Sequence, residues 1–231
     1  MKNKSKENMY PFIDDTFNII KGKCMYGCTY CYLIAMAKRF ERPQKPPMLD
    51  EKEFKTNLGR DLFIFLGSSI EMFAPNIPDY WILKTLEHCH KYDNKYMFHT
   101  KNPARMLQFQ HLMPLNSVLC VTIETNRHYK DIMRFAPSPE ERITPIRFDI
   151  EVNRRHNLHL TIEPIMDFDK DVFVRWINEI YPGPAQINIG ADSGNNNLPE
   201  PNKEKLQDFI ADLKSLGFNV FEKQNLKRLL K

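Results

Sequence analysis

Seven short runs of apolar and β-branched residues recur along this chain of 231 residues, and helix-like segments separate them. These runs are expected to form strands, and they cover residues 16–20, 61–67, 95–100, 117–125, 158–165, 185–190 and 218–222. Several are apolar almost without interruption, which is typical of strands covered on both faces. Strand alternating with helix predicts an α/β fold, a partial (β/α) barrel of about six parallel strands. A doubly wound open sheet is the alternative, and in both folds the chemistry lies at the carboxyl ends of the strands.

Six segments between these runs have helical spacing or helix-end signals. They are residues 48–60, 78–92, 102–112, 138–156, 170–181 and 201–217. Ser138 and Glu141 have the spacing of a capping box at a helix start, and Pro145 is expected to kink or restart that helix. Gly217 is expected to end the last helix, because glycine tolerates the left-handed conformation found there.

The pattern has no internal repeat and no convincing linker, since the Pro-rich stretch 41–47 is too short to divide domains. Residues 1–231 are therefore interpreted as one core domain. Lys and Arg number 33 against 29 Asp and Glu, and this net charge of +4 permits a nucleic acid partner without arguing for one. No apolar run has the length of a membrane span, and the charged N-terminus does not resemble a signal peptide, so a cytosolic protein is expected.

Three of the five cysteines lie within eight positions, where Cys24, Cys28 and Cys31 form a C-x3-C-x2-C motif. In the cytosol, cysteine at this density indicates thiol chemistry or metal binding rather than a disulfide framework. The motif follows the first predicted strand, and Gly22 and Gly27 let the backbone turn tightly around it. Such spacing suits zinc or an iron–sulfur cluster. The loop has no fourth Cys or His to close a zinc site, whereas three cysteines can hold a [4Fe–4S] cluster with one iron open. Three buried thiols or a zinc knuckle are the alternatives.

The same loop carries a family resemblance. With Tyr30 before its last cysteine, the motif resembles the signature of the radical S-adenosylmethionine (SAM) superfamily, and CMYGCTYCYL is similar to the cluster loop of the spore photoproduct lyases. Other stretches, among them GSSIEMFAPNIPDYW, MPLNSVLCVTIETN and TIEPIMDF, resemble a short phage and bacterial family of unknown function related to those lyases. This second resemblance identifies a family but says little about the substrate.

The resemblance implies an enzyme in which Cys24, Cys28 and Cys31 hold a [4Fe–4S] cluster that reductively cleaves SAM. The 5′-deoxyadenosyl radical so formed abstracts hydrogen from a substrate, while the protein supplies geometry and a dry cavity. Such a reaction also implies an electron donor, a reductase or a flavodoxin or ferredoxin.

The resemblance further implies a binding site for SAM. Tyr30 is expected beside the adenine, and the turn of Gly67, Ser68 and Ser69 is expected to receive the amino group, in place of the usual Gly-Gly-Glu-like sequence. This departure leaves the role of Glu71 open. Strand alternation places Thr122 and Glu124 on one face, where Glu124 can accept from the ribose hydroxyls or form a salt bridge to Arg127 or a Lys. Glu163 ends the following strand in the same way.

Substrate-binding and radical-handling candidates come from the same strand ends. Six polar residues are expected to line one mouth that suits a polar or phosphate-bearing substrate: Lys101, Asn102, Asp192, Ser193, Lys223 and Gln224. Cys120 is a candidate hydrogen donor to the product radical, with core packing as its alternative, and Tyr32 is a candidate radical relay. Cys89, on an apolar helix face, is expected to pack in the core.

The class of substrate stays open at this stage. Aromatic-plus-basic stretches such as residues 126–135 and the basic tail permit DNA or RNA, in lesion repair or base modification. A small nucleotide or metabolite is the alternative substrate. A non-enzymatic module with a structural zinc is the competing function.

Overall fold

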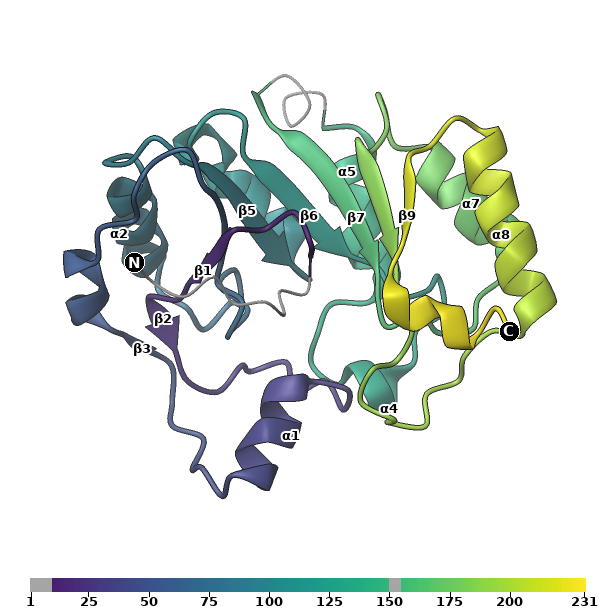
Figure 1. The fold of residues 1–231 in the computed structure, drawn as a ribbon, viewed down its shortest axis with the longest axis horizontal. Helices are drawn as coiled ribbons and strands as arrows, with labels where there is room; N and C mark the ends of the chain where they lie inside the picture. The colour runs from purple at the N-terminus through teal and green to yellow at the C-terminus, as the bar shows by residue number, and fades with distance from the viewer. Residues whose placement is uncertain (1–9, 150–154) are drawn as a thin grey trace.

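The computed structural model describes residues 10–149 and 155–231, and its centre is a parallel sheet of seven strands (Figure 1). The strands stand in the order β1 (Asp15–Phe17), β4 (Phe63–Leu66), β5 (Lys95–Thr100), β6 (Val118–Thr122), β7 (Asn157–Ile162), β8 (Gln186–Ile189) and β9 (Val220–Glu222). Every neighbouring pair is parallel. All seven predicted strands are thus confirmed, one more than the count of about six expected for the barrel.

The strand order follows the chain without reversing, so the doubly wound alternative is wrong. β1 and β9 form the two edges of the sheet and are not paired with each other among the described residues. The α/β class with parallel strands is therefore confirmed, whereas the partial barrel is not.

A second, two-stranded antiparallel sheet joins β2 (Ile20–Lys21) to β3 (Met48–Leu49). The helix predicted over residues 48–60 is wrong, because β3 and the 3-10 helix η1 (Glu51–Lys55) occupy its first half. Lys21 donates to Asp50 at 2.7 Å and to Glu53 at 2.8 Å. These tertiary ion pairs hold the segment in a conformation that local helical spacing does not reveal.

The other predicted helices form, most of them shorter than expected. Besides η1, the helical elements of the described residues are α1 (Tyr32–Arg39), α2 (Asp79–Cys89), α3 (Pro103–Met106), η2 (Leu107–Leu112), α4 (Lys130–Met133), α5 (Pro139–Arg147), α7 (Lys170–Asn178), α8 (Lys203–Ser215) and η3 (Gln224–Arg228). The capping box of Ser138 and Glu141 is confirmed at the start of α5. Pro145 lies inside α5, which ends at Arg147, and the predicted continuation over 150–154 lies outside the described residues. Gly217 has φ +87° just after α8, as expected of a helix stop.

Both faces of the sheet are covered, by two separate apolar clusters. The larger cluster joins one face to the helices, with alternate strand residues such as Leu119 and Val121 pointing into it. The smaller cluster covers the other face and contains Tyr10, Ile13, Phe65, Met97, Val118 and Cys120. The segment that precedes β1 therefore packs against the inner strands of the sheet. No helix among the described residues is long and apolar enough to cross a membrane.

Candidate functional site

A cavity of about 430 Å³ opens at the carboxyl ends of the parallel strands. In Figure 1 these strand ends point toward the side of α1 and α4. One wall is the loop of the cysteine motif with the start of α1. The other wall consists of residues at or just beyond strand ends, namely Gly67, Ser68, His99, Lys101, Thr122, Thr161, Glu163, Asp192 and Ser193. This is the edge at which the sequence predicts the chemistry.

The three clustered cysteines are all free thiols, and all three line this cavity. Cys28 is buried, while Cys24 and Cys31 are half-buried. Burial raises the pKa of the Cys24 and Cys28 thiols. No group of three or more His, Cys, Asp or Glu side chains in residues 10–149 and 155–231 is placed to hold a metal ion. The donor chemistry and the shared cavity fit a metal cluster, although the thiols do not form a closed ligand set.

The backbone of the cysteine loop is tied to the segment around α4. The amide of Thr29 donates to the carbonyl of Ile132 at 3.0 Å, and the amide of Phe135 donates to the carbonyl of Tyr26 at 3.1 Å. Gly27 turns the loop with φ +64°. These two hydrogen bonds and the turn at Gly27 fix the path of the loop against the segment around α4.

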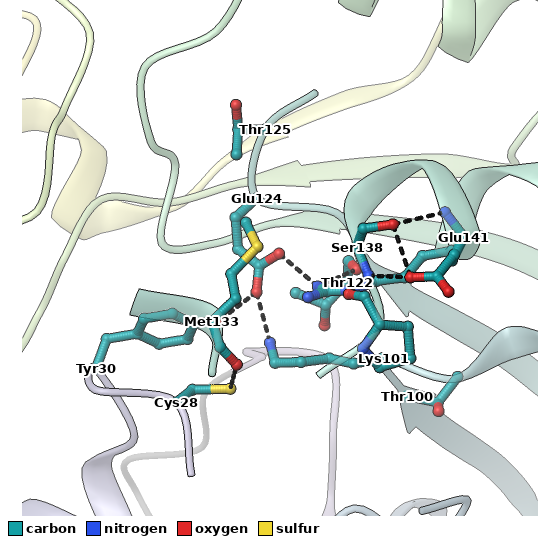
Figure 2. A network of polar contacts seen from close by, with 12 residues as sticks. Cys28, Tyr30, Thr100, Lys101, Thr122, Glu124, Thr125, Met133, Ser138 and Glu141 are labelled. Atoms are coloured by element: carbon teal, nitrogen blue, oxygen red, sulfur yellow. Dashed lines mark hydrogen bonds and ion pairs between the residues drawn. The ribbon is translucent and has the colours of Figure 1, made fainter. Parts of the chain in front are cut away.

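Glu124 is the centre of a buried network beside this loop (Figure 2). Its carboxylate lies 2.8 Å from Lys101 Nζ and 2.5 Å from Arg142 Nη1, and it accepts a hydrogen bond from the hydroxyl of Tyr30. Burial alone would raise the pKa of Glu124, but Arg142 and Lys101 outweigh it and hold this pKa at about 2. The salt-bridge interpretation of Glu124 is thus confirmed, with Lys101 and Arg142 as partners, since Arg127 pairs with Asp167 and Asp169 instead.

Glu124 does not line the cavity, so its predicted contact with the ribose stays a prediction. Tyr30 does line the cavity, with its ring 5.2 Å from Lys101 Nζ. Thr122 also lines the cavity, and its Oγ1 atom lies 2.5 Å from Nε2 of His99. Glu163 lines the cavity and accepts from Asn225 at 2.8 Å and from Lys223.

The turn of Gly67, Ser68 and Ser69, which follows β4, is only partly exposed to the cavity. Gly67 and Ser68 line it, whereas Ser69 bonds through its hydroxyl to Asn18 at 2.9 Å and lies outside the lining. Glu71 is not a freely solvated residue, because it lines the cavity and accepts from Thr100 Oγ1 at 2.7 Å. Burial raises the pKa of Glu71.

The six predicted substrate residues divide into two groups. Lys101, Asp192 and Ser193 line the cavity, whereas Asn102, Lys223 and Gln224 are not among its lining residues. Asn102 caps α3, where its side chain accepts from the amide of Arg105 at 3.3 Å. This capping role was not apparent from a strand-end position alone.

Lys101 and Lys223 reach the same edge of the sheet, but each already has a carboxylate partner. Lys101 pairs with Glu124, and the 7 % exposed Lys223 pairs with Glu163. Asp192 stabilises the loop in which it lies, since its carboxylate accepts a hydrogen bond from the backbone amide of Gly194 at 2.9 Å. Both ammonium groups at this edge are therefore already bound to a carboxylate.

The two radical-handling candidates lie in different surroundings. Cys120 is fully buried in the smaller apolar cluster, with Sγ 3.1 Å from Oγ1 of Thr161, and it does not line the cavity. Tyr32 lines the cavity and donates to the carbonyl of Ser68 at 2.9 Å. Cys89 is fully buried on α2, which confirms core packing.

Three residues of this site were missed by sequence reasoning. His99 lines the cavity, and burial, followed by the charges of Lys101 and Lys223, lowers its pKa to about 3. The sequence feature that could have identified His99 is that it is a polar residue next to the end of an apolar strand. Arg142 and Tyr10 gave no local signal, because their partners Glu124 and Thr161 are 18 and 151 positions away.

The fold is similar to solved structures of spore photoproduct lyase. One is a double variant with bound AdoMet and dinucleoside spore photoproduct, with a TM-score of 0.65 at 10 % identity, covering 96 % of this chain and 79 % of that chain. A second, complexed with dinucleoside spore photoproduct, has a TM-score of 0.62 at 10 % identity with the same coverage. A third, a cysteine-to-alanine variant with dinucleoside spore photoproduct, has a TM-score of 0.64 at 11 % identity and again the same coverage. At such identity, the likeness shows a shared fold.

A search of curated proteins gives no match. One family model matches residues 7–141, which include the cysteine loop, strands β1 to β6 and the start of α5. The match spans more than half of the chain, and the chain thus belongs to the family described as protein of unknown function, DUF5131.

Proposed function

We propose that this protein is a radical SAM enzyme in which Cys24, Cys28 and Cys31 hold a [4Fe–4S] cluster. The observation that carries the proposal is the position of three free thiols from one C-x3-C-x2-C loop on one wall of a cavity at the carboxyl edge of a parallel sheet. The likeness to spore photoproduct lyase over 96 % of the chain supports it. When bound, the cluster and SAM supply a 5′-deoxyadenosyl radical that abstracts hydrogen from a substrate.

The residues around the cavity have separate tasks in this proposal. Gly67 and Ser68 offer backbone and hydroxyl groups to the amino end of SAM, and Tyr30 offers its ring to the adenine. Neutral His99, bonded to Thr122, offers the cavity a polar group without a charge. Tyr32 bonds across to Ser68, and this contact narrows the mouth and helps to exclude water.

The ion pairs at the strand ends bear on the group that the cavity accepts. Lys101 is paired with Glu124, which also pairs with the buried Arg142, and Lys223 is paired with Glu163. Because these ammonium groups already have carboxylate partners, the cavity suits an uncharged polar group such as a base or sugar. One solved neighbour holds a dinucleoside. For this chain we accordingly propose a substrate of the nucleic acid or nucleotide class, converted by a lyase or a transferase reaction.

Anaerobic reconstitution tests the proposal. The wild-type protein is loaded with iron and sulfide, and about four iron per chain with a brown absorption band are expected. With dithionite and SAM, release of 5′-deoxyadenosine is expected. Cys24→Ala, Cys28→Ala and Cys31→Ala should each lose the iron and this release while circular dichroism shows an intact fold. Cys89→Ala is the matched control and should keep the iron, because Cys89 is buried on α2 away from the cavity. About one zinc per chain and no SAM cleavage would contradict the proposal in favour of a zinc module.

A further inference from the structure

Residues 22–47, here called the arm, leave the sheet after β2, pass through the cysteine loop and α1, and return to β3. Figure 1 shows α1 standing apart from the sheet and from the other helices. None of the residues of α1 is buried. The amide of Lys23 donates to the carbonyl of Lys45 at 2.8 Å, so the base of the arm is closed by a backbone hydrogen bond. The arm is thus a defined projection whose outer surface is not covered by the described residues.

The arm carries the whole net charge of the protein. It contains five cations, Lys23, Lys38, Arg39, Arg42 and Lys45, against one anion, Glu41, which gives 5 − 1 = +4. The complete chain also has a net charge of +4, so all other residues sum to zero. The five cations are exposed, and none forms an ion pair with another residue of the described part of the chain. Such a concentrated positive patch is the electrostatic footprint of a polyanion partner.

An exposed aromatic ring lies among these cationic side chains. Phe40 is 50 % exposed, and the guanidinium groups of Arg39 and Arg42 lie 5.4 Å and 5.3 Å from its ring centroid. A ring flanked by two guanidinium groups offers both stacking and phosphate contacts within one small area.

Residues on the inner side of the same arm line the cavity. Leu33, Ile34 and Gln44 line the cavity wall. Beyond the cysteine loop, the segment around α4 presents Phe135, which is 76 % exposed, and its amide bonds to the carbonyl of Tyr26 in the loop. A partner that lies along the arm therefore lies beside the mouth of the cavity.

We propose that the arm binds the backbone of a single-stranded nucleic acid, with a base stacked on Phe40 and phosphates on Arg39 and Arg42, while a neighbouring nucleotide enters the cavity. This inference rests on the proposed function, because it selects a polymer over a mononucleotide as the partner of the same cavity. A protein partner fits less well, since the core of a protein interface is depleted of charged residues, whereas the arm has five exposed cations against one anion. A membrane surface also fits less well, because the apolar residues Leu33 and Ile34 of the short α1 face the cavity rather than a lipid layer.

Fluorescence anisotropy tests the inference with a labelled single strand of about twelve thymidines and the cluster-free protein, at low and moderate salt. Wild-type protein should bind, and its affinity should fall as salt rises. The double variant Arg39→Gln/Arg42→Gln should lose about tenfold or more in affinity, and the slope of log affinity against log salt should fall by about 1.4, since each lost phosphate contact contributes about 0.7. Phe40→Ser should lose on the order of tenfold with little change in this slope.

The matched control is Arg60→Gln/Lys91→Gln, which removes the same charge. Arg60 and Lys91 precede β4 and β5, at the sheet edge opposite to the cavity, and both are exposed. The control should bind within about twofold of the wild type. An equal loss in control and arm variants, tighter binding to a duplex of the same length, or arm-dependent binding to anionic phosphatidylglycerol vesicles in place of the strand would overturn the inference.

The binding assay needs neither cluster nor SAM, so the two proposals fail separately. If the strand binds through the arm but the loaded protein does not cleave SAM, the inference stands and the proposed function fails. If SAM is cleaved but the wild-type protein does not bind the strand at about 50 mM salt, the inference fails alone.

Discussion

At the scale of single residues, Glu124 shows how the chain places a charge inside its core. The carboxylate and the guanidinium of Arg142 are both fully buried, and Lys101 supplies a second cation. Two cations around one carboxylate make the network sensitive to loss of the anion, since an unpaired buried charge is costly. Through Tyr30 the same network reaches the cysteine loop.

Glu124→Gln should therefore destabilise the protein by about 3 to 5 kcal/mol, because the two cations lose their counter-charge. Urea unfolding at neutral pH measures this change. Glu200→Gln is the matched control, since Glu200 pairs with Arg228, whose side chain is 45 % exposed, and about 0 to 1 kcal/mol is expected there. Equal effects of the two variants would show that Glu124 does not hold the network together.

The same carboxylate predicts a dependence on pH. The folded-state pKa of Glu124, about 2, lies below the ordinary value of 4.5, so its contribution to stability is complete above about pH 4.5 and is lost as pH falls toward 2. The difference in unfolding free energy between wild type and Glu124→Gln should accordingly be constant from pH 7 to about pH 5 and shrink at lower pH. A difference that is unchanged at pH 3 would contradict this assignment.

His99 gives a second prediction at this scale. Burial and the nearby charges of Lys101 and Lys223 lower its pKa from 6.5 to about 3, so the imidazole should be neutral at every pH from 8 down to 5. Nitrogen-15 NMR of the histidine rings should show a signal pair of His99 that does not titrate over this range. His99→Gln identifies that signal by its disappearance. A ring that titrates near pH 6.5 would mean that His99 is accessible to water.

At the scale of elements, the sequence was informative where the pattern is local. All seven sheet strands were predicted, because buried parallel strands are continuous apolar runs, and the cysteine loop was placed by its spacing. The helix over residues 48–60 was wrong, because ion pairs from Lys21 decide that segment. Arg142 and Tyr10 were missed for the same reason, since long-range contacts leave no periodic trace in the sequence.

The join between β2 and the arm gives a prediction for one element. Gly22 has φ +122°, and a Cβ atom there would lie 2.5 Å from the carbonyl oxygen of Pro46. Gly22→Ala should therefore both strain the backbone and push apart the two sides of the arm base, and we expect a loss of about 2 kcal/mol or more. Thermal unfolding and trypsin cleavage after Lys38 or Arg39 measure the effect.

Gly217→Ala is the control, because Gly217 also has a positive φ, +87°, but a Cβ atom there would meet nothing within 4 Å. It should cost about 1 kcal/mol and leave cleavage in the arm unchanged. If both variants behaved alike, the contact with Pro46 would have no effect on the arm.

At the scale of the whole molecule, side chains connect the two edges of the open sheet. Tyr10, before β1, bonds through its hydroxyl to Oγ1 of Thr161 in β7 at 2.8 Å. Lys223, after β9, lies 4.5 Å above the ring of Tyr10. The family match ends at residue 141, yet Thr161, Glu163 and Asp192 beyond it supply part of the cavity wall. The site is thus a property of the complete sheet.

Tyr10→Ala should remove this connection and the centre of the smaller apolar cluster, with a loss of about 3 to 5 kcal/mol. Tyr10→Phe keeps the ring and should lose only about 1 kcal/mol with the hydroxyl bond. Tyr80→Ala serves as the control, since Tyr80 is 56 % exposed on α2 and should change stability by less than about 0.5 kcal/mol. Denaturant unfolding compares the three, and a loss for Tyr10→Ala no larger than that for Tyr80→Ala would contradict a central role of the ring.

Cys31 is both the last cysteine of the motif and the residue that precedes α1 at its N-cap. A group bound by the three thiols would thus fix the first turn of the helix that presents Arg39 and Phe40. Because coupling between two binding events is reciprocal, an oligonucleotide bound to the arm would in turn raise the affinity of the three thiols for that group. Whichever ligand binds first would order the arm, and this would lower the entropic cost of binding for the second ligand.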